Sequence, residues 1–165
     1  MPRKGRKKTD GKPGEPTIHN RRARHDYFID DTIECGIKLT GTEVKSVRNG
    51  RVSLAEGYVR ASEDPIALEL HGVHIAEYPP AGEHHQHVPT RARPLLAHRR
   101  EIRKLAIRAR ESGVTLVPLR VYFVNGRVKV LIGVARGKRR ADKRQEISKR
   151  EAKREIDRAV SRRLP

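Results

Sequence analysis

The sequence contains a single cysteine, no tryptophan and two phenylalanines in 165 residues. One thiol cannot form an intramolecular disulfide, and Cys35 lies in an apolar alternation that is typical of a small buried side chain. No apolar run approaches the ~20 residues that span a bilayer. The charged N-terminus lacks the apolar segment of a secretion signal. We therefore expect a cytoplasmic protein that does not span a membrane.

Recognisable catalytic motifs are also missing. The glycine spacing around residues 41–46 is wrong for a phosphate-binding loop, and neither G-x-S-x-G nor H-E-x-x-H occurs. Acids cluster at Asp26, Asp30, Asp31 and Glu34, and such a cluster could hold a hard metal ion. Capping of strand ends or pairing with nearby arginines is the favoured alternative. The sequence therefore predicts no catalytic residue and no enzyme.

Three histidines, His84, His85 and His87, lie in a predicted loop over residues 79–94. No cysteine or paired carboxylate completes the tetrahedral ligand set that zinc requires. A solvated or RNA-contacting loop is therefore favoured over a zinc site, and we predict neither a metal nor a cofactor.

Positive charge is what the chain has in abundance, with a formal net charge of +18. Residues 1–24 hold nine Lys/Arg and two acids, and residues 136–165 hold thirteen Lys/Arg and five acids. The middle of the chain is close to neutral by comparison. Two basic ends on an ordinary globular segment favour a polyanionic partner, above all nucleic acid. A membrane surface is the weaker alternative, because basic membrane anchors carry large apolar side chains on an opposite face.

Residues 34–48 predict a strand that turns directly into a helix. Apolar and polar residues alternate over 33–39, which places one set of small apolar side chains on one sheet face. Tyr27, Phe28 and Ile29 begin a strand that Asp30-Asp31 interrupts before this alternation, and residues 27–39 are interpreted as one long or bent strand.

Thr40 and Glu43 have the spacing of a capping box, which predicts a helix over about 42–49. Gly50 suits the position just after the last turn. The helix carries two basic residues, Lys45 and Arg48. On local chemistry alone this is a plain strand-to-helix corner with solvated charges.

Further strands are predicted at 52–54, 58–61, 66–70, 74–76, 115–124 and 127–134. Asn125-Gly126 separates the last two and is a strong signal for a tight hairpin. The best helical pattern covers 95–112, with an apolar stripe at Ile102, Leu105, Ala106 and Ala109. Residues 20–25 are either a short helix capped by Asn20 or an extended arm.

These elements predict a mainly β fold: a small closed antiparallel barrel of the oligonucleotide-binding (OB-fold) type. About six strands, two to three flanking helices and a basic C-terminal tail are expected. We predict a disordered basic arm over 1–19, the barrel over 20–136, and a tail over 137–165 that is disordered when free. The tail has high helix propensity but a thin apolar stripe, so a polyanionic surface would be needed to fix it as a helix.

RNA binding is the chemistry that these residues favour. Basic side chains neutralise phosphates, and aromatic side chains on strands stack unpaired bases. Tyr27, Tyr58 and Tyr122 are in such positions, although each is more often a core residue. A carboxylate among the basic groups, Glu34, could accept hydrogen bonds from base amino groups or could simply be solvated.

Several motifs together resemble the SsrA-binding protein (small protein B) family. They are N-R-R-A-R-H-D-Y-F-I at 20–29, E-C-G-I-K-L-T-G-T-E-V-K-S-V-R at 34–48, R-A-R-P-L-L-A-H-R-R-E-I at 91–102, V-P-L-R-V-Y at 117–122 and V-A-R-G-K-R-R-A-D-K-R at 134–144. The resemblance covers about 20–144 in order and is very specific.

The resemblance implies a bacterial, non-enzymatic RNA-binding protein of trans-translation. The barrel would bind the tRNA-like domain of transfer-messenger RNA (tmRNA). Together with elongation factor Tu and the alanyl-charged RNA, it would enter stalled ribosomes, so that the nascent peptide is tagged. The basic tail would become helical in the empty mRNA channel near the decoding centre of the small subunit. A basic ribosomal or ribosome-assembly protein with an OB-type barrel is the alternative.

Matching positions imply RNA-binding roles for Asn20, Tyr27, Glu34, Leu95, Leu96 and Lys129. In that context Lys45 and Arg48 become candidate phosphate contacts. The tail motif implies ribosome-binding roles for Gly137, Lys138, Arg139, Asp142, Lys143 and Arg144. Two positions depart from the family pattern. Pro94 replaces a basic residue at what we expect to be a helix start, and Ala141 replaces a histidine or aromatic residue.

Overall fold

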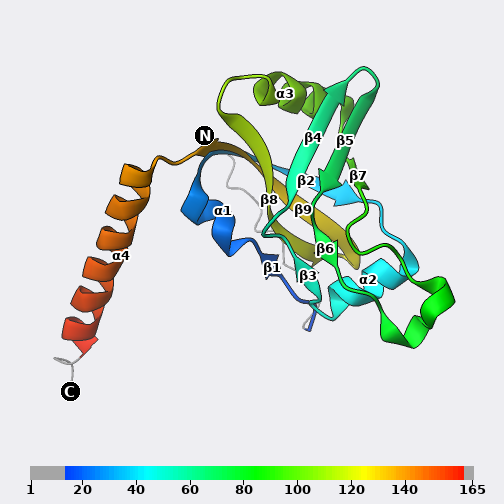
Figure 1. Ribbon diagram of the computed structural model, residues 1–165, viewed down its shortest axis with the longest axis horizontal. Coiled ribbons are helices and arrows are strands. Elements are labelled where there is room, and N and C mark those ends of the chain that lie inside the picture. Colours follow the sequence, from blue (N-terminus) through cyan, green and yellow to red (C-terminus); the bar gives the residue numbers. More distant parts are fainter. Residues whose placement is uncertain (1–13, 162–165) are drawn as a thin grey trace, which may run out of the picture.

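The computed structural model describes residues 14–161 (Figure 1). Its strands are β1 (Ile18–His19), β2 (Tyr27–Ile37), β3 (Val52–Ser53), β4 (Tyr58–Glu63), β5 (Ile66–His71), β6 (His74–Ile75), β7 (Arg93–Leu96), β8 (Val114–Val124) and β9 (Arg127–Gly137). The α-helices are α1 (Arg21–Asp26), α2 (Gly41–Arg48), α3 (Arg99–Ala109) and α4 (Arg140–Ser161), with 3₁₀ turns η1 (Pro79–Ala81) and η2 (Glu83–His85).

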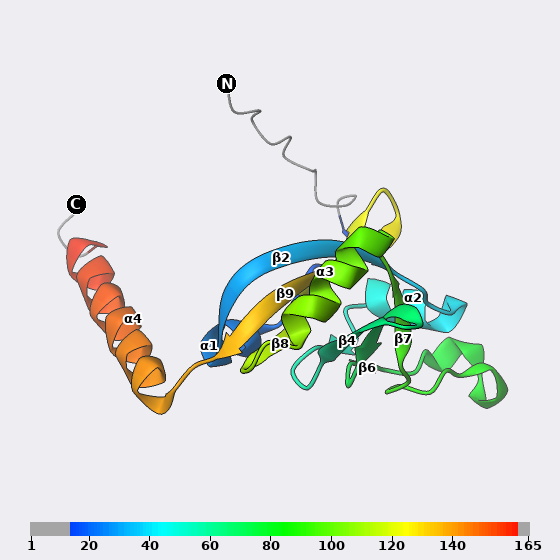
Figure 2. The same cartoon turned by 90° about the horizontal axis from the view of Figure 1, so that it is seen from above.

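Six antiparallel strands of the described chain close into a ring. Their order is β8–β4–β5–β7–β2–β9, and β9 pairs back with β8. The short β1 pairs with residues 120 and 121 of β8, beyond the point where β4 pairs with that strand. Strands β3 and β6 form a separate two-stranded sheet. Figure 2 shows the long β2 curving alongside β9. The predicted mainly β closed barrel is confirmed.

The barrel interior is filled by the alternating apolar side chains that the sequence indicated. On β9, Val128, Val130 and Ile132 are buried, whereas Lys129 and Leu131 face the outside of the ring and are partly exposed. Cys35 is also buried, as expected for a small apolar residue. The helix α3 packs against β4, β5 and β8 through its apolar stripe, Ile102, Leu105 and Ala106.

Two local signals in the sequence gave the correct geometry. Asn125 and Gly126 have φ angles of 50° and 74°, so both central residues of the β8–β9 turn are left-handed, as a tight hairpin turn requires. Thr40 caps α2 in the predicted capping box, and its backbone N–H donates to Oε2 of Glu43 at 2.8 Å. Asn20 caps α1, so residues 20–25 form the helix rather than the extended arm.

The predicted helix over 95–112 is wrong at its start. Residues Arg93–Leu96 form the strand β7, which pairs with β5 and β2 and closes the ring. Pro94 therefore lies in a strand opposite Glu69, not at a helix start. The helix α3 begins only at Arg99, after a capping box in which the His98 backbone N–H donates to Glu101 at 2.9 Å.

The tail contains a 22-residue helix, α4, that projects away from the barrel in both views (Figures 1 and 2). Whether this segment is ordered in the free protein stays a prediction. At the other end, Ile18 and His19 pair with β8, so they belong to the sheet and not to the predicted arm. Residues 1–13 of that arm lie outside the described residues.

Candidate nucleic-acid interface

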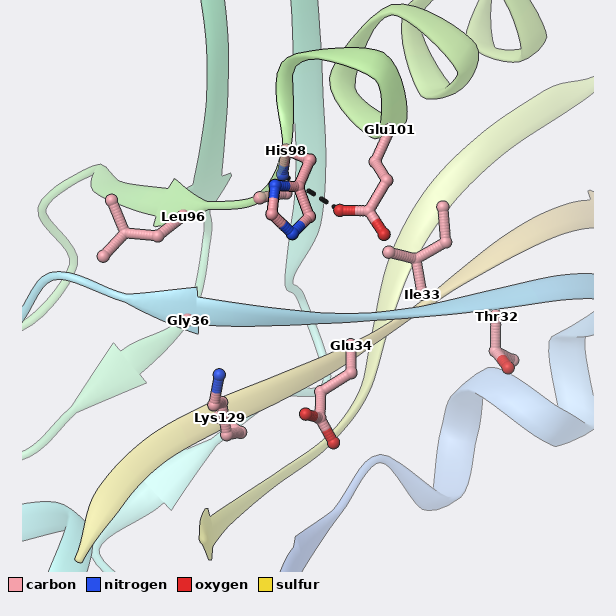
Figure 3. Close-up of a pocket in the computed structure, with 9 residues that line it drawn as sticks. Thr32, Ile33, Glu34, Gly36, Leu96, His98, Glu101 and Lys129 are labelled. Atoms are coloured by element: carbon pink, nitrogen blue, oxygen red, sulfur yellow. Dashed lines mark hydrogen bonds between the residues drawn. The ribbon is translucent and has the colours of Figure 1, made fainter. Parts of the chain in front are cut away.

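Three of the predicted RNA-binding residues, Glu34, Leu96 and Lys129, line one depression on the barrel surface. The remaining lining residues are Thr32, Ile33, Gly36, Ala97, His98 and Glu101. Figure 3 shows Glu34 and Lys129 on one side of β2, with Leu96, His98 and Glu101 on the other. Strand pairing thus brings together side chains that are far apart in the sequence.

Gly36 is the point at which the three strands of this depression meet. It pairs with Leu96 on β7 and with Lys129 on β9. A Cβ atom at Gly36 would lie 3.3 Å from the Cβ of Leu96, so a larger residue would press on the neighbouring strand. The glycine keeps β7 close to β2, which holds Leu96 and Lys129 on either side of it.

The Tyr122 hydroxyl donates a hydrogen bond to Oε2 of Glu34 and so fixes the position of this carboxylate. Burial, together with this carboxylate, raises the pKa of Tyr122 to about 12. The Arg120 guanidinium lies over the Tyr122 ring, 4.5 Å from the ring centroid. Because Tyr122 is only 3% exposed, it is not a platform for stacking bases. It is a support for Glu34.

The two neighbouring leucines have different environments. Leu96 is 60% exposed and lines the depression, whereas Leu95 is 4% exposed and belongs to the barrel core. Leu95 therefore anchors β7, and any effect that it has on RNA binding is indirect.

Asn20 and the remaining tyrosines lie outside this depression. The Asn20 side chain is buried, donates to the carbonyls of Leu54 and Pro118 at 2.9 Å each, and accepts from the Ala23 backbone N–H. It fixes α1 against the barrel. Tyr27 packs on a small cluster under α1, and Tyr58 is half exposed and stacks on the ring of His71.

Lys45 and Arg48 are exposed on α2, and the depression does not include them. The Lys45 ammonium lies 5.0 Å from the ring centroid of Tyr78, and the Arg48 guanidinium lies 5.8 Å from that of Phe123. An adjoining hollow, lined by Val44 of α2 together with Leu96 and Lys129, lies between α2 and the depression.

The position of α2 depends on a buried ion pair that sequence reasoning missed. Glu43 and Arg93 have fully buried side chains, with Nε of Arg93 2.8 Å from Oε1 of Glu43. Nε of Arg91 is also 2.8 Å from that oxygen. Burial would raise the pKa of Glu43, but hydrogen bonds from Arg91, Thr40 and Arg93 outweigh it and lower the pKa to about 2. The capping carboxylate thus also ties α2 to β7.

The predicted tail residues begin at the junction between β9 and α4. Lys138 donates from Nζ to the Arg24 carbonyl at 2.8 Å and lies over the ring of Phe28. Lys143 forms an ion pair with Asp26 at 2.8 Å, and hydrogen bonds from Lys143 and His25 lower the pKa of Asp26 to about 2.

The other tail residues also follow the end of the barrel. The Arg139 backbone N–H donates to Asp142 at 2.9 Å, which caps the first turn of α4. Gly137 ends β9, and Arg144 is exposed on α4. The six tail residues are therefore grouped at the tail junction, apart from the depression around Glu34.

Neither the acid cluster nor the histidine loop forms a metal site in the described part of the chain. Asp30 pairs with Arg136 at 3.0 Å, and Asp31 pairs with Lys104 at 3.3 Å, so pairing with basic residues was the correct alternative. Both ring nitrogens of His87 are engaged, with the hydroxyl of Thr42 at 2.9 Å and the carbonyl of Ile75 at 3.0 Å. Across residues 14–161, no helix has the length and apolar character needed to cross a membrane.

Comparison with known proteins gives one consistent result. The model of the SmpB protein family matches residues 17–162. An SsrA-binding protein of Thermobifida fusca is 55% identical over 159 residues, which cover 96% of this chain and 98% of the relative. One from Kineococcus radiotolerans is 54% identical over 144 residues, covering 87% and 90%.

Among solved structures, the chain is similar to one from "tmRNA-SmpB: a journey to the center of the bacterial ribosome". The TM-score is 0.64 at 46% sequence identity, over 80% of this chain and 94% of the solved one.

Proposed function

The chain belongs to the SmpB protein family, and from this membership we propose that it binds tmRNA and acts with it in trans-translation on the ribosome. It is an RNA-binding protein and not an enzyme. Because it acts on the bacterial ribosome, the protein is located in the cytoplasm.

The observation that carries the proposal for the site is the convergence of Glu34, Leu96 and Lys129 on one depression from three strands. An ammonium group binds phosphate, a carboxylate accepts from base amino groups or ribose hydroxyls, and an exposed leucine packs on a base or sugar. Three different chemistries on a rigid barrel suit a folded RNA of defined shape better than a uniform phosphate surface.

The other predicted RNA-binding residues take supporting or peripheral roles in this proposal. Asn20 and Leu95 are buried, so they position α1 and β7. Lys45 and Arg48 contact phosphates at the edge of the site, from a helix whose position is fixed by Glu43. Tyr27 packs against the apolar cluster that contains Ala23 of α1. The RNA surface bound would be the tRNA-like domain.

The tail would act on the ribosome. A 22-residue helix is about 33 Å long, since an α-helix rises 1.5 Å per residue. Because α4 projects away from the barrel, the barrel can hold the RNA while α4 enters the mRNA channel near the decoding centre. Elongation factor Tu would accompany the alanyl-charged RNA on entry.

Binding measurements with three RNAs test this function. The purified protein should bind tmRNA much more tightly than ordinary tRNA or ribosomal RNA at moderate salt, where non-specific phosphate binding is weakened. Equal affinity for all three would favour a general basic ribosomal or assembly protein and would overturn the proposal.

A further inference from the structure

A second hollow lies between α1 and β8, and its lining is rich in arginine. The lining residues are His19, Asn20, Arg21, Arg24, Leu119, Arg120 and Leu131. Arg21 and Arg24 come from α1 and Arg120 comes from β8, so two elements contribute the charge. The buried Asn20 side chain ties α1 to the barrel, so the backbone that carries Arg21 and Arg24 is held beside Arg120 of β8.

Arg21 and Arg24 differ from Arg22, the arginine that lies between them on α1. Arg22, the helical neighbour of Arg21, pairs with Glu56 at 2.7 Å and with Asp26 at 3.3 Å. Within residues 14–161, in contrast, Arg21, Arg24 and Arg120 have no ion pair with a carboxylate.

Arg120 adds an observation of a different kind. Its Nε is buried and has no hydrogen-bond acceptor among the described residues, although its guanidinium stacks on the Tyr122 ring. A buried N–H without an acceptor is costly, and such groups in native proteins normally have a reason. An oxygen of a bound anion would satisfy this donor.

Phosphate is the anion that this arrangement fits best. The planar guanidinium presents parallel N–H groups that match two phosphate oxygens, and stacking on an aromatic ring fixes that plane. The hollow also adjoins the first site. Arg120 stacks on Tyr122, which holds Glu34, and Leu131 pairs with Glu34 across the β2–β9 ladder.

We propose that the hollow of Arg21, Arg24 and Arg120 binds a backbone phosphate of the same RNA that occupies the Glu34 depression. The inference rests on the proposed function, because it takes tmRNA as the ligand. The hollow gives the RNA a second contact with the barrel, next to Tyr122 and the Glu34 depression. Two separate contacts fix the orientation of the RNA.

The salt dependence of binding tests this site. In the double variant Arg21→Ala/Arg24→Ala, tmRNA affinity at low salt should fall at least about tenfold. The slope of log K against log salt should decrease by roughly one for each lost phosphate contact. Arg120→Gln should likewise reduce the slope by about one.

The matched control is Arg22→Ala/Arg110→Ala, which removes the same charge from two exposed arginines that are already paired with acids. This control should keep most of the wild-type slope, and thermal unfolding should confirm that all variants fold. An unchanged slope in either test variant, or an equal decrease in the control, overturns the proposal. Failure of the proposed function would appear separately, as a wild-type protein that binds tRNA as tightly as tmRNA.

Discussion

Replacement of Glu43 by Gln should destabilise the whole barrel, even though the new side chain has nearly the same shape. Glu43 is fully buried and receives hydrogen bonds from Arg91, Arg93 and the Thr40 backbone N–H. Removal of its charge leaves the fully buried Arg93 guanidinium without a counter-ion. Breaking one side of a buried ion pair typically costs about 3–5 kcal/mol.

The lowered pKa of Glu43 indicates the same order of magnitude. The pKa falls from 4.5 to about 2 on folding, and at about 1.4 kcal/mol per unit this corresponds to roughly 3 kcal/mol. A domain of this size is stable by only about 5–15 kcal/mol. The variant should therefore lose a large fraction of its free energy of unfolding in urea denaturation at pH 7.

The effect of the charge should also depend on pH. Because the folded-state pKa is lowered, this stabilisation is complete above the unfolded pKa near 4.5 and is lost as pH falls toward 2. The difference in unfolding free energy between wild type and Glu43→Gln should therefore shrink over that range. Other acids titrate in both proteins and largely cancel in the difference.

Glu101→Gln is the matched control, since Glu101 has the same place in the capping box of α3 but pairs with no buried arginine in the described chain. It should cost no more than about 1 kcal/mol, the usual value of a cap. An equal loss in the two variants, or a Glu43→Gln loss below about 1 kcal/mol, would refute the argument that the buried pair fixes α2.

Three further variants test the site and the tail. Tyr122→Phe should keep the fold within about 1.5 kcal/mol in urea denaturation and weaken tmRNA binding several-fold, because Glu34 loses its support; unchanged affinity would show that the hydroxyl has no positioning role. Glu34→Ala should weaken tmRNA binding in a filter assay although it makes the protein more basic, and tighter binding would mean that the carboxylate is merely solvated. Truncation after Arg136 should leave tmRNA affinity intact but abolish tagging on stalled ribosomes, and persistent tagging would show that the tail role is wrong.

The elements that could be predicted from the sequence depend on local interactions. The Asn125-Gly126 turn, the Thr40 capping box and the apolar stripe of α3 are each set by residues within a few positions of one another. The closed barrel followed from the number and alternation of the strands. These features needed no knowledge of which strands are neighbours.

The features that were missed depend on pairing between distant strands. Leu95 and Leu96 were assigned to a helix because the helical pattern of α3 lies directly after them, and Arg93 and Pro94 were assigned to the loop before it. The alternation of buried and exposed residues over Arg93–Leu96 indicates a strand only when the neighbouring strands β5 and β2 are known. The burial of Arg93 is in turn what places Glu43 in an ion pair.

The site shows the same limit. Glu34, Leu96 and Lys129 were identified through the family resemblance, but their common depression follows from the register of Gly36 with two other strands. The support of Glu34 by Tyr122, 88 residues away in the sequence, has no local signal. For the same reason Leu95 and Asn20, which match family positions, are core residues of this fold.

Sequencing of the RNA that co-purifies with the protein from its bacterial host tests the central claim most directly. The account predicts that tmRNA is the most enriched RNA after a moderate-salt wash, and that this enrichment falls for Glu34→Ala. A pool dominated by ribosomal RNA, with tmRNA no more abundant than ordinary tRNA, would contradict it.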